Sequence, residues 1–118
     1  MKKIEAIIRK TKFEDVKEAL YEAGIEWFSY MNVRGVGKAS QERIYRGVIY
    51  DTSIIERIML SIVVRDKNVD LTVKAIIEAA ATGDVGDGRI FVSPVDQSYS
   101  IRSGKSGEST LFTEGSKI

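Results

Sequence analysis

The stretch TGDVGDGRIFVSPV, residues 82–95, decides how the rest of this chain is interpreted. Its first half holds Gly83, Gly86 and Gly88, whose main chain can approach a ligand closely and whose amides can cradle a phosphate. A plainer alternative is a helix end followed by an Asp-Gly turn. Its second half, residues 89–95, is an apolar run of strand length. The stretch therefore predicts a helix-to-strand connection with room for an anion.

The segments before this stretch alternate between strand and helix patterns. Residues 3–9 form a short Ile-rich run without a breaker, which favours a strand. Residues 12–23 carry apolar positions at helical spacing, and Thr11 with Glu14 makes a capping-box pattern at their start. Residues 25–36 favour a second strand, because their aromatic and β-branched residues lack helical spacing.

The middle of the chain repeats this alternation after a polar excursion. Residues 38–56 mix charges with aromatic residues, which is typical of a long loop or a protruding hairpin. Residues 58–64 resume as a strand. Asn68 is predicted to cap a second helix that leaves at Gly83. Residues 99–102 favour a short final strand.

The predicted order is strand, helix, strand, strand, helix, strand. This is the α+β pattern of the ferredoxin-like double βαβ sandwich, with two helices on one face of a sheet. The other face of the sheet needs cover, which a second copy of the chain could provide. We expect one domain over residues 1–104, a protruding loop at 37–55, and a flexible Gly- and Ser-rich tail at 105–118.

Composition excludes several classes of function. The 118 residues include 18 Lys and Arg against 17 Asp and Glu, so no broad basic field for nucleic acid is present. Histidine and cysteine are absent, which removes thiolate nucleophiles and the usual zinc ligands. The first apolar run is too short and too charged for a signal peptide or a membrane span, so we expect a cytoplasmic protein without membrane insertion.

Two further segments could carry binding. Residues 35–38, GVGK, form a second permissive turn with a cation, although a plain strand-to-loop transition explains them equally well. Tyr45, Arg46 and Tyr50 are suited to partner recognition, or they belong to an ordinary two-sided hairpin. No nucleophile, base and orienting group occur together, so we expect no catalytic residues and no metal site.

Several stretches fall in the order of one known family. They are MKKIEAII at the start, DVKEAL at 15–20, YRG at 45–47 followed by Tyr50, the fourteen residues at 82–95, and IRSG at 101–104. In these stretches the chain resembles the PII signal-transduction proteins, the nitrogen regulators, and it looks nearest to a nitrogenase-associated or divergent branch. The resemblance implies a compact homotrimer with ATP or ADP in three clefts between subunits. Three protruding loops would dock on a target, either a membrane transporter or a metabolic enzyme or regulator.

The resemblance also implies a set of nucleotide-binding residues. One side of the cleft would be formed by Ile7, Ser29, Gly35, Val36, Gly37, Lys38 and Val63. The phosphates would be held by Gly86, Asp87, Gly88 and Arg89, and Arg102 would reach them from the adjacent subunit. Tyr45, Arg46 and Tyr50 would contact the target.

The chain also departs from the family pattern. Ala39 stands where many members have a glutamine that helps a magnesium ion and ATP to hold 2-oxoglutarate, and alanine has no side-chain ligand. Magnesium could still accompany the nucleotide, but the 2-oxoglutarate site is doubtful. Ser100 replaces a family arginine. These departures favour, as alternatives, a nucleotide-insensitive adaptor or structural trimer; a small enzyme on the same fold is a third reading.

Overall fold

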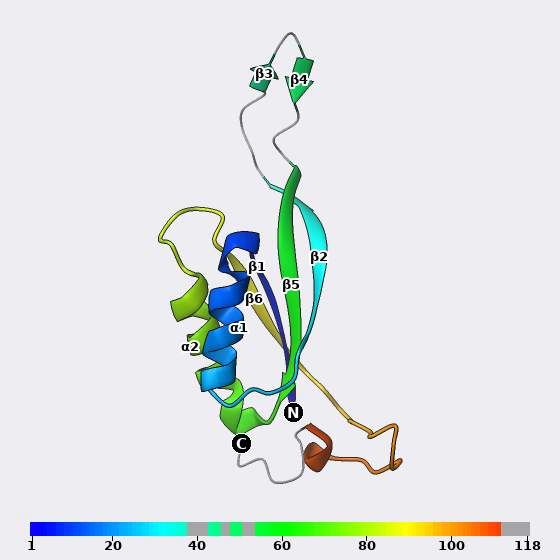
Figure 1. Cartoon of the computed structure of the whole chain (residues 1–118). Helices are drawn as coiled ribbons and strands as arrows, with labels where there is room; N and C mark the ends of the chain where they lie inside the picture. Colours follow the sequence, from blue (N-terminus) through cyan, green and yellow to red (C-terminus); the bar gives the residue numbers. More distant parts are fainter. Residues whose placement is uncertain (38–42, 46–47, 51–53, 112–118) are drawn as a thin grey trace.

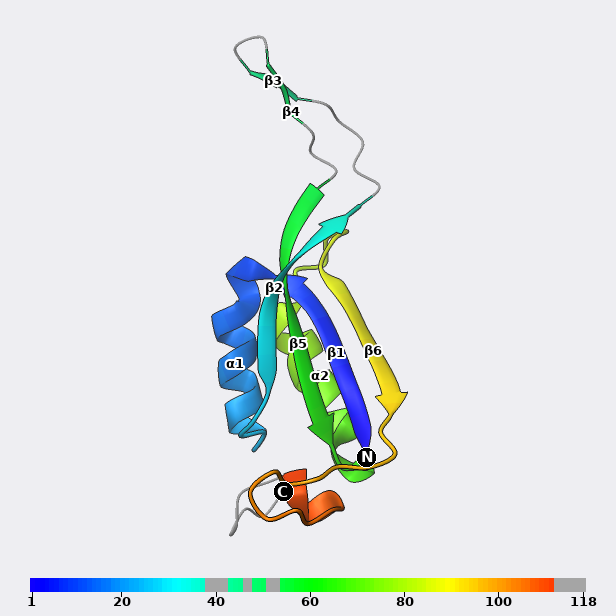
Figure 2. The ribbon, with the colours of Figure 1, turned by 90° about the vertical axis from the view of Figure 1, so that its right-hand side faces the viewer.

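The computed structural model describes residues 1–37, 43–45, 48–50 and 54–111. Its centre is a four-stranded sheet in the order β2-β5-β1-β6 (Figures 1 and 2). The strands are β1 (Lys2–Arg9), β2 (Ser29–Val36), β5 (Ile54–Val64) and β6 (Gly88–Pro94). Every neighbouring pair in this sheet is antiparallel.

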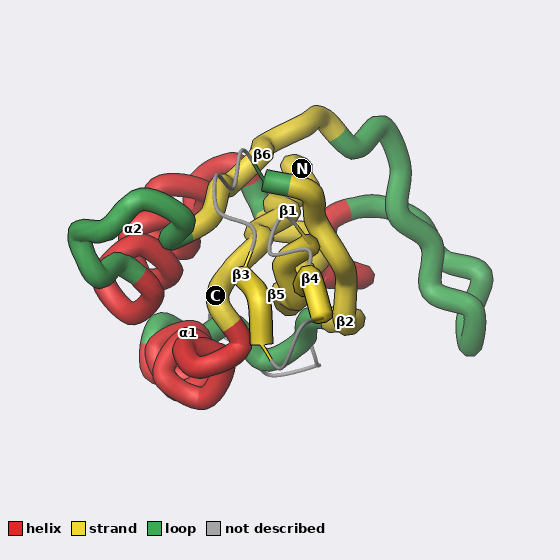
Figure 3. The backbone as a smooth tube through the Cα atoms, turned by 90° about the horizontal axis from the view of Figure 1, so that it is seen from above, coloured by secondary structure: helices red, strands yellow, loops and turns green. Residues whose placement is uncertain are grey.

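Two helices cover one face of the sheet. They are α1 (Phe13–Glu22) and α2 (Val69–Ala80), and they lie side by side (Figures 1 and 3). Short 3-10 turns precede them at Lys10–Lys12 and Asp66–Asn68, and a third such turn spans Glu108–Leu111. The predicted α+β, ferredoxin-like order is confirmed.

The core lies between the helices and the sheet. Side chains alternate along a strand, and the even-numbered positions of β1 and β5 are the buried ones. Each fully buried aliphatic side chain of this kind stabilises the fold by roughly 1.5–3 kcal/mol. The core residues are Ile4, Ala6, Ile8, Val16, Leu20, Ile25, Ile58, Leu60, Ile62, Val64, Ile76 and Ala80, of which Ile25 lies in the connection between α1 and β2 and the others lie in strands or helices.

The odd-numbered positions of the four strands project to the opposite side, which we call the open face. Its composition is mixed, because Met59 and Val63 alternate there with Arg57 and Ser61 along β5. Phe91 on β6 is 52% exposed and Met31 on β2 is 51% exposed. Both α1 and α2 lie on the other side of the sheet (Figure 3).

The helix starts differ from the sequence prediction. Thr11 lies within a 3-10 turn, and α1 is entered from Lys12 without a side-chain capping bond, so the predicted capping box does not form. Asn68 does precede α2, but its side chain makes no capping bond either. The tight turn supplies the backbone geometry instead, and the Thr72 hydroxyl donates to the Asn68 carbonyl at 2.6 Å.

Two strand starts also differ. β2 begins at Ser29 rather than at residue 25, because a turn follows α1. Gly24 lies in this turn at φ 85°, and the Ile25 amide donates to the Leu20 carbonyl at 2.9 Å. β5 begins at Ile54 rather than at residue 58, because it pairs with β2 as far as Val36.

The predicted excursion contains a small hairpin. Strand β3 (Arg43–Tyr45) pairs with β4 (Val48–Tyr50), beyond the ends of β2 and β5 (Figure 1). Tyr45 and Tyr50 therefore belong to paired strands. Arg46 lies outside the described residues, as do Lys38 and Ala39.

The segment after β6 makes a wide turn and folds back. The predicted final strand at 99–102 is only an isolated bridge between Tyr99 and Ser106, followed by a turn. The Gly107 amide donates to the Ser98 carbonyl at 2.9 Å, and Glu108 lies 3.9 Å from Arg65. The described part of the expected tail thus has contacts, and residues 112–118 lie outside the description.

Candidate functional site: the glycine loop and the open face

The connection between α2 and β6, residues 82–88, is here called the glycine loop. Its three glycines have φ values of 90°, 98° and 120°, which other residues rarely adopt. Gly88 is further restricted, because a Cβ there would lie 1.8 Å from the carbonyl oxygen of Ile7. Glycine at 88 lets the loop join the sheet against β1.

The Asp87 side chain anchors this loop from inside. Its carboxylate accepts hydrogen bonds from the Thr82 amide at 2.8 Å and the Gly83 amide at 2.9 Å, and also from the Thr82 hydroxyl. Arg9 Nε donates to it at 3.2 Å from the end of β1. The Thr82 hydroxyl, followed by the backbone amides and Arg9, holds the pKa of Asp87 well below its usual range.

Two arginines hold the outside of the loop. Arg9 and Arg57 are directly opposite each other on β1 and β5. Arg9 Nη2 donates to the Val85 carbonyl at 3.2 Å, and Arg57 Nη2 donates to the Gly86 carbonyl at 3.2 Å. Burial, with a smaller effect of the neighbouring Arg9 charge, lowers the pKa of Arg57. The loop carbonyls therefore turn toward two cations.

The backbone amides of the same loop remain available. Among the hydrogen bonds of the described residues, none uses the N–H of Val85 or Gly86. Successive amides of a glycine-rich turn form a concave donor surface that suits an anion. With its carbonyls held by arginines and its amides unpaired, the loop can receive phosphate oxygens.

The predicted site residues at odd-numbered strand positions share the open face, whereas Val36 and Gly88 are at even positions. Ile7 and Arg89 are directly opposite each other on β1 and β6. Ser29 and Gly35 on β2 and Val63 on β5 occupy the same parity of the register, so they also project from this face. A Cβ on Gly35 would meet nothing within 4 Å, which leaves room beside it. Val36 and Gly37 follow at the end of β2.

The candidate residues nevertheless separate into two groups. Ile7, Gly35 and the glycine loop lie at the end of the sheet nearest the β3–β4 hairpin. Ser29 and Val63 lie toward the other end, and the turn that holds Arg102 is also there (Figures 1 and 2). One chain therefore does not bring the whole predicted set together.

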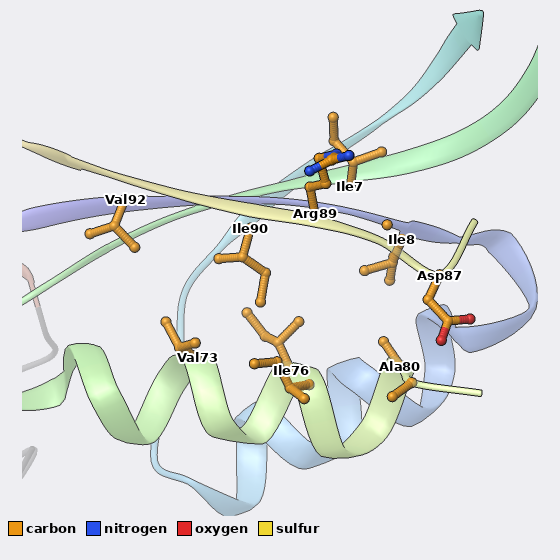
Figure 4. Close-up of a pocket in the computed structure, with 12 residues that line it drawn as sticks. Ile7, Ile8, Val73, Ile76, Ala80, Asp87, Arg89, Ile90 and Val92 are labelled. Atoms are coloured by element: carbon orange, nitrogen blue, oxygen red, sulfur yellow. The ribbon is translucent and has the colours of Figure 1, made fainter. Parts of the chain in front are cut away.

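An apolar cavity of about 440 Å³ lies next to the glycine loop (Figure 4). Ile8, Ile90 and Val92 point into it from the sheet, and α2 forms the opposite wall. The side chains of Ile7 and Arg89 point away from α2, toward the open face. The cavity opens on the helix side of the sheet, and Asp87, Gly88 and Arg89 of the predicted phosphate contacts are among the residues that line it.

Sequence reasoning missed Thr82 and Arg9 as parts of the loop. Thr82 opens the quoted stretch, but nothing in the sequence pairs its hydroxyl with Asp87. Arg9 is 78 residues away from Asp87, so only the folded sheet brings them together. The contact of Arg57 with the Gly86 carbonyl likewise joins segments that are distant in the sequence.

The described ranges lack two further features, a metal-binding cluster and a membrane-spanning helix. No group of three or more Asp, Glu, His or Cys side chains gathers there in a way that could hold a metal ion. No helix there is long and apolar enough to cross a membrane.

The fold and the loop define a class of small α+β domain with a glycine-rich loop at one end of its sheet. The model of the family described as nitrogen regulatory protein P-II matches residues 1–105, and the chain belongs to this family. A nitrogen regulatory protein P-II of Microchaete diplosiphon is 47% identical over 106 residues, which cover 89% of this chain and 95% of that protein. Proteins of the same name from Rhodobacter capsulatus (94% of this chain, 100% of that protein) and Azospirillum brasilense (91% and 96%) are 42% and 41% identical.

Proposed function

We propose that this chain is a non-enzymatic signalling protein of nitrogen metabolism that binds ATP or ADP and acts on a target protein through its protruding hairpin. The observation that carries the proposal is the glycine loop, in which the amides of Val85 and Gly86 are unpaired among the described residues. Arg89, exposed on the open face, would add a cation beside the phosphates.

The second part of the proposal is that the protein forms a homotrimer. Ser29, Val63 and Arg102 lie far from the glycine loop within one chain, so a second copy would have to bring them to it. The open face carries exposed Phe91 and Met31, and burying these side chains against another copy is favourable. We propose that nucleotide sites form between neighbouring copies, and light scattering should give the mass of three chains.

Calorimetry tests the nucleotide proposal directly. ATP and ADP titrated into the full-length protein should release heat and compete with each other. Arg89→Ala should weaken ATP binding by about tenfold or more, since a charge-assisted contact is lost. The matched control is Lys74→Ala, which removes an exposed cation of α2 that pairs with Glu78. Wild-type protein that binds neither nucleotide would refute the proposal.

The nucleotide-insensitive adaptor remains the competing function, and Ala39 and Ser100 favour it. A pull-down with ATP against ADP separates the two functions. Partner capture that changes with the nucleotide supports signalling through ligand-dependent populations of the hairpin. Capture that is the same with ATP, ADP and 2-oxoglutarate supports the adaptor. The partner we expect is a membrane transporter or a metabolic enzyme or regulator.

A further inference from the structure

Asp87 has no acceptor capacity left for a ligand in this arrangement. A carboxylate offers about four lone-pair sites. Four donors already reach it: the Thr82 amide, the Thr82 hydroxyl, the Gly83 amide and Arg9 Nε. A negative charge at this point would also repel a phosphate. The side chain is therefore better placed to hold the loop than to contact the nucleotide.

Arg9 joins this anchor to the sheet. Its guanidinium donates from Nε to the Asp87 carboxylate and from the neighbouring Nη2 to the Val85 carbonyl, both at 3.2 Å. Ile8, the residue before Arg9, is paired with Gly88 on one side and Ile58 on the other, so Arg9 extends from a fixed strand. The fork of an arginine can hold two acceptors at once, which a lysine ammonium does less rigidly.

We infer that the side chains of Thr82, Asp87 and Arg9 form a clasp that positions the glycine loop for phosphate without themselves contacting the nucleotide. The clasp keeps the loop carbonyls turned inward, so that the unpaired amides of Val85 and Gly86 stay together. The ordering of the loop is then complete before the ligand arrives, which favours affinity. This inference rests on the proposed nucleotide function, because it names the residues that prepare the same site.

Calorimetry with ATP on single variants measures the contribution of the clasp. Asp87→Asn and Arg9→Gln should each weaken ATP binding by about ten- to a hundredfold, since the loop must then be ordered during binding. Arg9→Lys should restore part of the affinity, because the charge returns without the fork. The matched control is Asp84→Asn in the same loop, whose side chain has no hydrogen bond to another described residue. Its affinity should stay within about twofold.

Two comparisons separate positioning from direct contact. A magnesium ligand at Asp87 would make the loss in Asp87→Asn depend on magnesium, whereas a clasp predicts the same loss with magnesium and with a chelator. The double variant Arg9→Gln with Asp87→Asn should lose little more than either single variant, because the two residues act as one unit. Additive losses, or a loss seen only with magnesium, would overturn the clasp.

Hydrogen exchange of the ligand-free protein tests the clasp independently of nucleotide binding, because it measures how well the loop amides are protected. The amides of residues 82–84 should exchange faster in Asp87→Asn and Arg9→Gln than in wild type, while the β1–β5 pairs of the sheet centre stay protected. Unchanged exchange in the loop would overturn the clasp. Faster exchange together with a wild-type protein that binds no nucleotide would instead refute the proposed function and leave the clasp as a property of the loop.

Discussion

The two faces of the sheet are built from the same four strands, but one face packs the core and the other carries the candidate binding site. The face under α1 and α2 buries Leu60 and Ile62 almost completely and holds the fold together. The open face exposes Phe91, and it gathers Ile7 and Arg89 at the glycine loop. Because adjacent residues of a strand point to opposite faces, substitutions one position apart should have separate effects on stability and on binding.

The largest expected difference is between Leu60 and Met59, neighbours on β5. Leu60→Ala should lower the free energy of unfolding by about 2–5 kcal/mol, because it opens a cavity in the core. Met59→Ala on the open face should cost about 1 kcal/mol or less in dilute protein. Urea denaturation at one fixed protein concentration measures both. Equal losses would contradict the division of labour between the faces.

Gly88 tests the junction where the open face meets the loop. Gly88→Ala should lower the free energy of unfolding by about 2–4 kcal/mol, since the new Cβ would lie 1.8 Å from the Ile7 carbonyl at a φ of 120°. Gly35→Ala is the control, because its Cβ would meet nothing within 4 Å. Thermal unfolding followed by circular dichroism compares the two. A Gly88 variant as stable as the Gly35 variant would be evidence against this loop geometry.

Substitution of Thr72 measures how much a buried hydrogen bond on the helix face contributes to stability. Thr72→Val should cost about 1 kcal/mol, because it removes a buried hydroxyl that donates to the Asn68 carbonyl at the start of α2. Ser61→Ala removes a hydroxyl from the open face and should change the free energy of unfolding by less than about 0.5 kcal/mol. Chemical denaturation of both variants makes the comparison, and the reverse order would contradict it.

Acid should weaken the loop end of the open face in particular. Hydrogen bonds lower the pKa of Asp87, and the Lys10 ammonium at 3.1 Å lowers the pKa of Glu56. A lowered folded pKa gives stability that is present above the unfolded value, near pH 4, and is lost as the pH falls. Unfolding measured from about pH 5 to pH 2 should therefore show falling stability. Asp87→Asn should flatten that slope; a slope identical to that of the wild-type protein would contradict the assignment.

The sequence predicted the order of elements better than their ends. The short apolar runs of β1 and β5 and the helical spacing of Val73, Ile76 and Ala80 are local patterns that match the final packing. The cap at Thr11 was wrong, because a 3-10 turn supplies the same helix start from backbone bonds alone. The start of β5 was also wrong, since pairing with β2 extends a strand through charged residues that look like loop.

The sequence predicted the glycines of the site but not the side chains that hold the glycine loop in place. Gly86 and Gly88 could be predicted because closely spaced glycines indicate a turn with positive φ, and both residues have positive φ in the structure. The roles of Thr82 and Arg9 depend on contacts between distant segments, which spacing does not encode. The two-ended placement of Ile7 and Val63 is likewise visible only in the register.

The distance along the chain between Arg9 and its loop partners also has a meaning for folding. The Arg9 contacts span 76 and 78 residues, so they can form only after β1, β5 and β6 have assembled. Until then, the facing guanidiniums of Arg9 and Arg57 lack the loop carbonyls that offset their repulsion. The glycine loop should accordingly be among the last parts of the domain to form and among the first to open in local unfolding.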